Sequence, residues 1–257
     1  MPLNPYTLAT LAEQPDLAER FHPQKRRIWP PFMLEDTTAN RLWHHLGEDF
    51  ADFQHYLLNE AGEPVAVGQA IPLRWDGTQA GLPIGWSDCL VQGASDLSSD
   101  HEPDTLAALE IAISPDYTGQ RLSYTMLKAM RATAQSRGMK ALIVAVRPSM
   151  KTRYPLTPMA QYVRWARDDG LPFDPWLRVH WQVGGEILHV AHPSMRIEGT
   201  VAAWEGWTGM QFPESGDYVI DFALSPIQVD RAADFGLYLE PNVWVHHPIT
   251  TEWLRRS

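Results

Sequence analysis

The stretch Ala107-Ala108-Leu109-Glu110-Ile111-Ala112-Ile113, continued by Ser114-Pro115-Asp116-Tyr117-Thr118-Gly119-Gln120, decides the fold of this chain. Its apolar first half predicts a buried strand, and its second half predicts a tight turn. A helix is predicted from about Arg121 to Arg137, because apolar residues recur there at helical spacing. Gly138 ends this helix, and the apolar run 141–146 predicts a second buried strand. This order implies two parallel strands joined by a right-handed crossover.

The turn that opens the helix predicts an anion-binding site. The first N–H groups of a helix have no partner within the helix, and the positive end of its dipole points the same way. Phosphate groups bind readily at such a point. The unit therefore favours a phosphorylated ligand, although the same unit also occurs in proteins that bind none.

The sequence from Ile113 to Ser123, followed by Met126-Leu127, resembles the acyl-CoA motif of the GNAT superfamily, the acyl-CoA-dependent N-acyltransferases. The match is good at Ile113, Pro115, Tyr117, Gly119 and Leu122. The motif is not matched at three positions: Thr118 replaces the usual Arg or Gln, Arg121 the first Gly, and Ser123 the second Gly or Ala. The resemblance implies that backbone amides of this loop hold the pyrophosphate of coenzyme A.

The three departures have a physical meaning. Glycine is favoured in such a loop because a side chain obstructs the approach of phosphate to the backbone. Ser123 is small and can donate a hydrogen bond, and the Arg121 guanidinium can point outward and pair with a phosphate oxygen. We therefore expect coenzyme A to bind through Thr118, Gly119, Gln120, Arg121, Leu122 and Ser123. The alternative is a helix N-terminus in a family member without cofactor.

The resemblance also implies a mixed α/β fold of the α+β type, with a central twisted mixed sheet flanked by helices. We expect an N-terminal helical segment at 1–29, a GNAT-like core at 30–195, and a C-terminal extension packed on that core at 196–257. Strand-like runs at 52–58 and 64–71 predict a hairpin. The Gly-, Ser- and Asp-rich residues 76–104 predict a loop, and 176–183 with 186–191 predict a closing hairpin.

Glu110 is the candidate general base. A carboxylate in an apolar strand is costly unless it is hydrogen-bonded or faces a cleft. In many GNAT proteins an acidic residue on the corresponding strand accepts the proton of the amine. The resemblance further implies that the backbone of Ala112 and Ile113 holds the pantetheine arm, and that Tyr154 or Tyr162 protonates the leaving thiolate. The alternatives are an ion-paired structural Glu110 and two tyrosines that only pack.

The function implied by the resemblance is acyl transfer from acyl-CoA, with acetyl-CoA as the expected donor, to the amine of a small molecule by direct attack in a ternary complex. The alternative is a non-catalytic GNAT-fold module that binds coenzyme A or a small apolar ligand. Eleven tryptophans could serve an apolar acceptor pocket, although core packing is the commoner use of such residues.

Composition limits the partners. The formal net charge of −10 makes nucleic acid a poor partner, since phosphate contacts need clustered Lys and Arg. No apolar run is long enough for a bilayer, and no secretory signal is visible, so a cytoplasmic protein without membrane contact is expected. One cysteine excludes an intrachain disulfide, and the histidines predict no metal site. A homodimer is left open.

Overall fold

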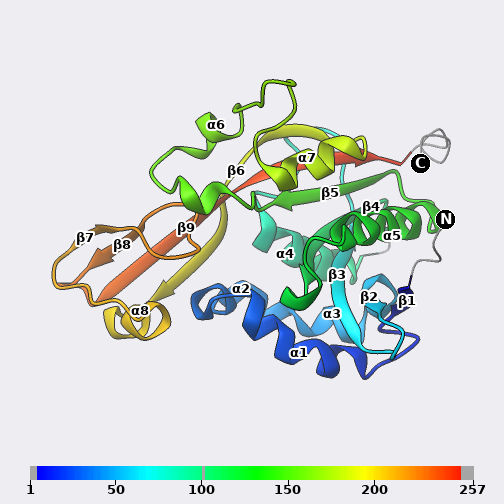
Figure 1. The fold of residues 1–257 in the computed structure, drawn as a ribbon, viewed down its shortest axis with the longest axis horizontal. Helices are drawn as coiled ribbons and strands as arrows, with labels where there is room; N and C mark the ends of the chain where they lie inside the picture. The colour runs from blue at the N-terminus through cyan, green and yellow to red at the C-terminus, as the bar shows by residue number, and fades with distance from the viewer. Residues whose placement is uncertain (1–4, 100–101, 250–257) are drawn as a thin grey trace.

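The computed structural model describes residues 5–99 and 102–249, which form one mixed sheet with helices on both faces (Figure 1). The nine-stranded sheet has the order β1-β2-β3-β4-β5-β9-β8-β7, with β6 paired to β9. Its strands are β1 (Thr7–Thr10), β2 (His55–Leu58), β3 (Pro64–Leu73), β4 (Thr105–Ile113), β5 (Ala141–Val146), β6 (Glu186–Gly199), β7 (Gly216–Tyr218), β8 (Ile227–Asp230) and β9 (Phe235–Pro248). Only β4 and β5 pair in parallel.

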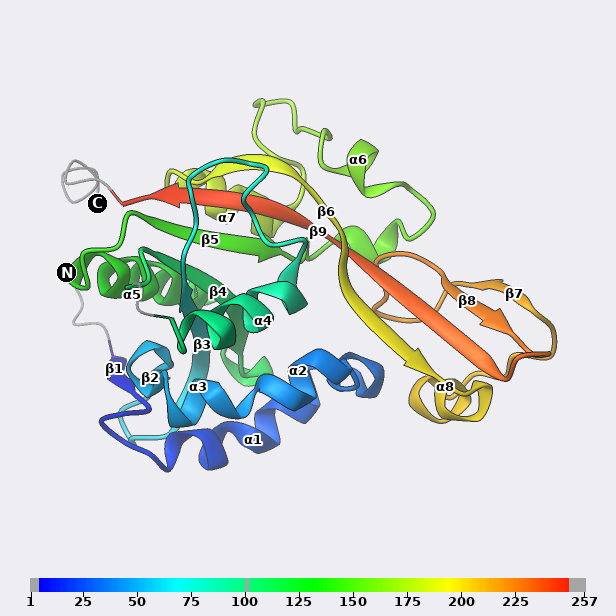
Figure 2. The same ribbon diagram turned by 180° about the vertical axis from the view of Figure 1, so that it is seen from behind.

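Two layers of helices enclose the sheet, as Figures 1 and 2 show from opposite sides. The helices are α1 (Leu17–Ile28), α2 (Thr37–Leu42), α3 (His44–Glu48), α4 (Trp86–Asp96), α5 (Leu122–Ser136), α6 (Met159–Tyr162), α7 (Pro175–Gln182) and α8 (Val201–Thr208). On one face, α1 to α4 cover β3, β4 and β5. On the opposite face, α5 packs on the same strands.

The central unit of β4, α5 and β5 confirms the prediction for 107–148. The expected apolar stripe of α5 is buried against β3, β4 and β5; it consists of Leu122, Met126, Leu127, Met130 and Ala134. Each large apolar side chain buried in this way stabilises the fold by about 1.5–3 kcal/mol. Gly68 of β3 lets α5 approach closely, because a Cβ there would lie 2.5 Å from Met126.

The strand β9 lies inside the sheet although it belongs to the expected C-terminal extension. Its residues 243–248 pair with β5, and its other edge pairs with β6 along nearly its whole length. The expected boundary at residue 195 falls within β6. Residues 200–234 form the part that projects from the core, with α8, β7 and β8 around a separate hydrophobic cluster that contains Trp204.

Three predicted elements are wrong. The segment expected to be helical at 1–29 contains β1, which pairs with β2, and is helical only in α1; its residues 1–4 lie outside the described residues. The expected loop 76–104 contains the helix α4. The expected strand 176–183 is the helix α7, because the Asp174 carboxylate accepts hydrogen bonds from the N–H groups of Trp176 and Leu177 and Pro175 stands at the first helical position. The closing hairpin is instead formed by β6 and β9.

A buried histidine pair joins α7 to β9. His180 Nδ1 lies 2.9 Å from His247 Nε2, and Arg131 NH1 lies 3.2 Å from His247 Nδ1. Arginine only donates, so His247 carries its proton on Nε2 and donates it to His180. Burial lowers the pKa of His180 from 6.5 to about 3 and lowers the pKa of His247 well below 6.5.

This pair predicts a loss of stability in mild acid. The folded pKa values lie below the unfolded value, so the unfolded chain binds more protons below pH 6.5. The free energy of unfolding should fall by up to about 1.4 kcal/mol per pH unit and per histidine between pH 6.5 and pH 4.5. Urea unfolding at several pH values should show a shallower slope for His180→Phe than for the wild type. The exposed control His22→Gln should keep the wild-type slope, and equal slopes in all three proteins would contradict the assignment.

No helix within residues 5–99 and 102–249 combines the length and the apolar character needed to cross a membrane.

Candidate functional site

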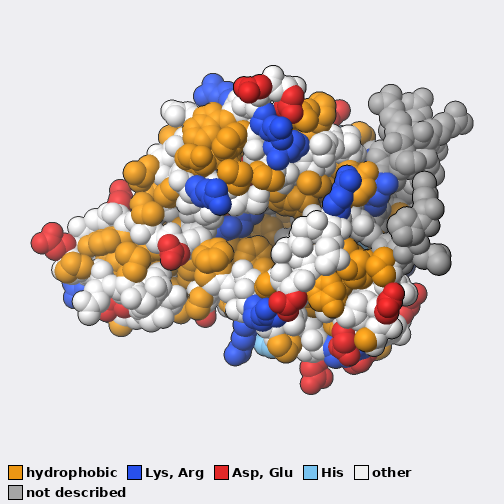
Figure 3. All heavy atoms as spheres, viewed as in Figure 1, with side chains coloured by type: hydrophobic (Ala, Val, Ile, Leu, Met, Phe, Trp, Pro, Cys, Tyr) orange, Lys and Arg blue, Asp and Glu red, His pale blue; other side chains and the backbone are white. Residues whose placement is uncertain are grey.

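The parallel strands β4 and β5 part halfway along their length. Residues 105–108 of β4 pair with residues 141–144 of β5, and the register ends there. Beyond Ala108, β4 continues to Ile113 along β3, whereas β5 continues along β9. The second half of β4 therefore has an unpaired edge toward β5. Figure 3, which views the molecule as in Figure 1, shows a hollow in the middle of the surface, with hydrophobic and basic side chains inside it.

A β-bulge turns Glu110 toward the helix α1. Gln69 of β3 is opposite Glu110, whereas Ala70 is opposite Ala108, so Leu109 is an extra residue in β4. A bulge leaves one residue unpaired and re-aims the side chains that follow it. Leu106 and Ala108 pack toward α5, whereas Leu109 belongs to the cluster on the opposite face, and Ala112 belongs to the cluster under α1. The bulge thus brings the Glu110 side chain to the face of α1, at the start of the unpaired edge.

The Glu110 carboxylate is nearly buried and has two partners on the last turn of α1 and the residue after it. The Trp29 indole N–H donates to Oε1 at 2.5 Å, and the Lys25 ammonium lies 3.1 Å from Oε2. The Lys25 contact is an ion pair, and besides this ammonium Oε2 has no hydrogen-bond donor among the described residues. Of the two alternatives for Glu110, an ion-paired carboxylate is therefore present.

The loop at the end of β4 is open. Thr118, Gly119, Gln120 and Arg121 are exposed. Within the described part of the chain, no acceptor is found for the backbone N–H groups of residues 119–123, which precede the first bonded amide of α5 at Tyr124. Gly119 and Arg121 both have positive φ, at 79° and 61°. Gly119 and Arg121 are thus left-handed on either side of Gln120. Such alternating backbone conformations form the concave nests of N–H groups that bind anions.

Arg121 is left-handed and exposed at the start of α5. Its left-handed conformation explains why glycine is usual there, since a side chain at positive φ is strained. The guanidinium lies 5.5 Å from the centre of the Tyr124 ring. Leu122 is buried on α5, and Ser123 is half-buried at the second position of the helix.

The backbone groups of Ile113 and Ala112 point in opposite directions. The N–H of Ser114 donates to Val65 of β3, and Val67 is opposite Ala112, so the alternation of an antiparallel ladder directs Ala112 toward β3 as well. The same alternation directs Ile113 and Ile111 toward the gap between β4 and β5. Of the two expected residues, Ile113 thus directs its backbone groups toward the gap, as Ile111 does, and Ala112 directs them toward β3.

A second buried carboxylate lies on β9 and differs from Glu110. Glu240 on β9 is fully buried and receives hydrogen bonds from Arg147, Tyr238 and Asn242 at 2.9 to 3.1 Å. Burial alone would lower the pKa of Arg147, but the Glu240 carboxylate raises it. Both oxygens of Glu240 are therefore occupied, so that this residue holds Arg147 at the end of β5. The Arg147 guanidinium lies 6.0 Å from the Trp29 ring, which links it to the surroundings of Glu110.

Three tryptophans contact Glu110, its partner Lys25 or its neighbour Leu109. Trp29 donates to it, the Trp43 ring lies 4.9 Å from the Lys25 ammonium, and the Trp86 indole donates to the carbonyl oxygen of Leu109 at 2.6 Å. Trp43 and Trp86 are stacked with their ring centres 5.9 Å apart. Other tryptophans are core, as the commoner use predicts; Trp204 and Trp244 are fully buried.

Tyr154 and Tyr162 lie in an aromatic cluster with Trp165 and Phe173, on the β5–β9–β6 side of the molecule. Tyr162 is buried, and its hydroxyl donates to Asp174 at 2.8 Å. Burial and this hydrogen bond raise its pKa, so that it holds its proton firmly. In Figures 1 and 2 the helix α6, which carries Tyr162, lies beyond β6, away from β4. The structure therefore does not bring the two tyrosines to Glu110; they pack.

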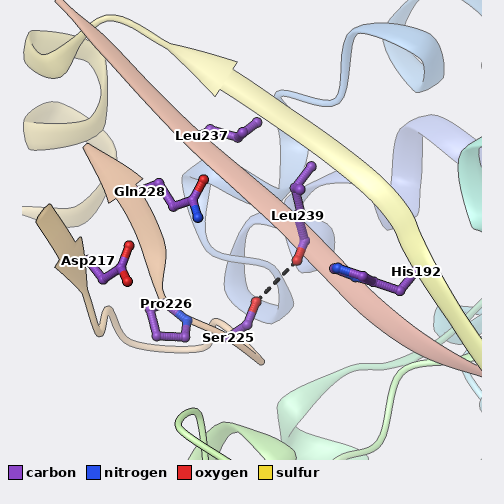
Figure 4. A pocket seen from close by; sticks show the side chains of 7 residues that line it. All are labelled: His192, Asp217, Ser225, Pro226, Gln228, Leu237 and Leu239. Atoms are coloured by element: carbon purple, nitrogen blue, oxygen red, sulfur yellow. Dashed lines mark hydrogen bonds between the residues drawn. The ribbon is translucent and has the colours of Figure 1, made fainter. Parts of the chain in front are cut away.

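A cavity of about 220 Å³ lies in the projecting part, far from this gap. Its lining side chains come from β6, β7, β8 and β9 and from the turn before β8 (Figure 4). Asp217 and Gln228 face the cavity, and the Ser225 hydroxyl donates to the carbonyl oxygen of Leu239. The projecting part and α5 lie at opposite ends of the molecule in Figure 1, so this cavity is separate from Glu110 and the open loop.

The arrangement fits an acyl thioester with a pyrophosphate at the other end of an extended arm. The amides of 119–123 provide donors for phosphate oxygens, and the unpaired edge of β4 provides backbone groups for the arm. Glu110 lies where that edge begins, with the Lys25 ammonium 3.1 Å from its Oε2. A carboxylate beside a polarised carbonyl can remove the proton of an attacking nucleophile.

Comparison with known proteins agrees with this geometry. The chain is 32% identical, over 95% of its length and 94% of the relative's, to the arginine N-acetyltransferase avaD of Aspergillus versicolor. No protein-family model matches the chain.

Two solved structures share the fold over almost the whole chain. The loading GNATL domain of CurA from Lyngbya majuscula is 18% identical, with a TM-score of 0.63 over 96% of this chain and 98% of that one. The GphF GNAT-like decarboxylase in complex with isobutyryl-CoA is 18% identical, with a TM-score of 0.52 over 95% of this chain and 99% of that one. At these identities the likeness concerns the fold.

Proposed function

The chain belongs to the GNAT superfamily and is an acyl-CoA-dependent N-acyltransferase, and from that premise we propose that it acetylates the α-amine of arginine or of a closely similar cationic amino acid. The name of the relative supports both acetyl-CoA as donor and arginine as acceptor. A non-catalytic binding module, the alternative left open by the sequence, is set aside because the likeness to an enzyme extends over nearly the whole chain.

The observation that carries the proposal is the Glu110 carboxylate beside the parted strands, with the Lys25 ammonium 3.1 Å from its Oε2. Glu110 removes the proton of the bound amine, and the neutral amine then attacks the acyl carbon. Coenzyme A supplies the thioester that makes this carbon reactive. The amides of Gly119, Gln120, Arg121, Leu122 and Ser123 hold its pyrophosphate, and Thr118 precedes them in the loop.

The surroundings of Glu110 favour a cationic acceptor. Indole faces attract ammonium and guanidinium groups, and the Trp43 ring lies 4.9 Å from the Lys25 ammonium that pairs with this carboxylate. The net charge of −10 also draws cations to the protein. Of the nitrogens of arginine, the guanidinium does not lose its proton in proteins, so the α-amine is the nitrogen that is acylated.

An acceptor series tests this function. Purified protein with acetyl-CoA and L-arginine should release free thiol and form Nα-acetylarginine, as measured by thiol titration and mass spectrometry. Nα-blocked arginine should give no thiol release, because only the guanidinium remains. Acetyl-CoA at about 100 times its Kd should also raise the free energy of unfolding by about 2.7 kcal/mol. Turnover of Nα-blocked arginine, or no turnover of any amine, would contradict the proposal.

A further inference from the structure

The Lys25 ammonium occupies a site built for a primary amine. Nζ lies 3.1 Å from Glu110 Oε2, donates to Gln69 Oε1 at 2.7 Å, and lies 4.9 Å from the centre of the Trp43 ring. A carboxylate, an amide oxygen and an indole face are together the groups that recognise an ammonium ion. The side chain keeps 19% of its exposure, so the site is not sealed.

The position of the Lys25 ammonium relative to Glu110 is the basis of the inference. An acceptor amine that is to lose its proton to Glu110 must come within hydrogen-bond reach of that carboxylate. Lys25 Nζ is a primary amine at that distance, at the start of the unpaired edge of β4. The side chain thus stands where the acceptor has to stand.

We propose that Lys25 is a self-acylation site, at which the enzyme transfers an acyl group from acyl-CoA to its own Nζ. The proposal rests on the proposed function, because it uses Glu110 as the base and the gap between β4 and β5 as the place of the thioester. It adds a second, intramolecular acceptor to the small-molecule amine.

The step balances as an ordinary acyl transfer. The Nζ ammonium gives one proton to Glu110, and the neutral nitrogen forms a bond to the acyl carbon. The bond between that carbon and sulfur breaks, and its electron pair stays on sulfur. The second proton of Nζ goes to the sulfur, which leaves as the thiol of coenzyme A, and the third stays on the new amide nitrogen.

The other lysines provide internal controls. The chain has four lysines: Lys25, Lys128, Lys140 and Lys151. Lys140 is 79% exposed and pairs with Asp104, so it is the one that reagents in solution reach most easily. Lys151 is buried and donates to the carbonyl oxygens of Tyr154 and Leu224. Lys128 lies over the Tyr124 ring on α5.

Peptide mass spectrometry tests the proposal. The full chain is incubated with acetyl-CoA and no acceptor, and acetylation of each lysine is followed over time. Lys25 should be acetylated at least about tenfold faster than Lys140, since general base catalysis alone contributes about 10²–10⁴ in rate. The N-hydroxysuccinimide ester of acetic acid, which needs no coenzyme A, should reverse this order and modify Lys140 first.

Two variants separate catalysis from chance reactivity. Glu110→Gln should slow the acetylation of Lys25 by at least about tenfold and leave the slow reaction of Lys140 unchanged. Lys25→Arg keeps the positive charge beside Glu110 and should remove the acetylated peptide. Its melting temperature, compared with that of the wild type, shows whether it folds.

The outcomes distinguish this proposal from the proposed function. A preparation that acetylates arginine but leaves Lys25 unmodified would overturn self-acylation alone. Equal acetylation of Lys25 and Lys140, unaffected by Glu110→Gln, would overturn it as well, because the reaction would then be uncatalysed. A protein that acylates neither free amines nor Lys25 would overturn both.

Discussion

Glu110→Gln lowers kcat/KM for amine acetylation by about 10²–10⁴, the usual contribution of a positioned base, and leaves the affinity for coenzyme A nearly unchanged. The amide has almost the same shape and can still accept the hydrogen bond of the Trp29 indole. It cannot take a proton from the amine. The open loop at 119–123 lies at the other end of the exposed strand edge, so pyrophosphate binding does not depend on this side chain.

The measurement is a pair of assays on the same protein: initial rates of thiol release and a calorimetric titration with coenzyme A. Glu63→Gln is the matched control, because Glu63 is an exposed carboxylate whose partner is Arg20 on the surface. It should change neither quantity. Equal losses of rate and of coenzyme A affinity in Glu110→Gln would show that Glu110 supports the structure of the site and is not its base.

Ser123→Asp weakens coenzyme A binding by at least about 100-fold and leaves the protein as stable as before, or slightly more stable. Ser123 is the second residue of α5, next to N–H groups without acceptors in the described structure. A carboxylate there meets the positive end of the helix dipole, which stabilises the helix by about 0.3–1 kcal/mol. The same charge repels a pyrophosphate at about 4–5 Å by roughly 3–4 kcal/mol at an effective dielectric constant of 20.

The affinity for coenzyme A should fall while the stability does not, so a general loss of structure would not produce the expected result. Ser123→Asn has the same shape as the aspartate without its charge, so it should lose far less affinity. Calorimetry measures the affinity, and thermal unfolding measures the stability of each variant. Affinity lost equally in Asn and Asp would indicate a steric effect. Affinity kept in both would place the pyrophosphate elsewhere.

The elements that depend on residues close together in the sequence were predictable. The strand before residue 113, the stripe of α5 and Gly138 lie within one short segment, so periodicity alone places them. The Gly- and Ser-rich residues around α4 predicted a loop. Trp86, Cys89, Leu90 and Gly93 nevertheless recur at helical spacing, and they form α4. The helix α7 carried its own signal in Asp174-Pro175, a capping residue followed by proline.

The pairing of distant segments was not predictable in this way. β6 and β9 are separated by the whole of α8, β7 and β8, so no local pattern says that they are neighbours.

The site residues differ in the same way: those with a local sequence signal were predictable, and those brought from distant segments were not. Glu110 stood out because a charge interrupted an apolar strand, and the open loop followed from a motif. Lys25 and Trp29 come from a distant helix, and their only signal was a basic run followed by Trp29-Pro30-Pro31. The acid candidates Tyr154 and Tyr162 were chosen by their place after β5. That segment folds away from β4, and the Tyr162 hydroxyl is bound by Asp174.

The position of β9 constrains how the chain is made. During synthesis β5 leaves the ribosome before its neighbour exists, because residues 243–248 follow it only after β6, α8, β7 and β8. Until then one edge of β5 is bare, and bare edges attract other strands. A nascent chain paused before residue 235 therefore exposes an unpaired edge of β5, which is prone to aggregation. Chaperones that bind such edges should have their largest effect on the yield of folded protein at this stage.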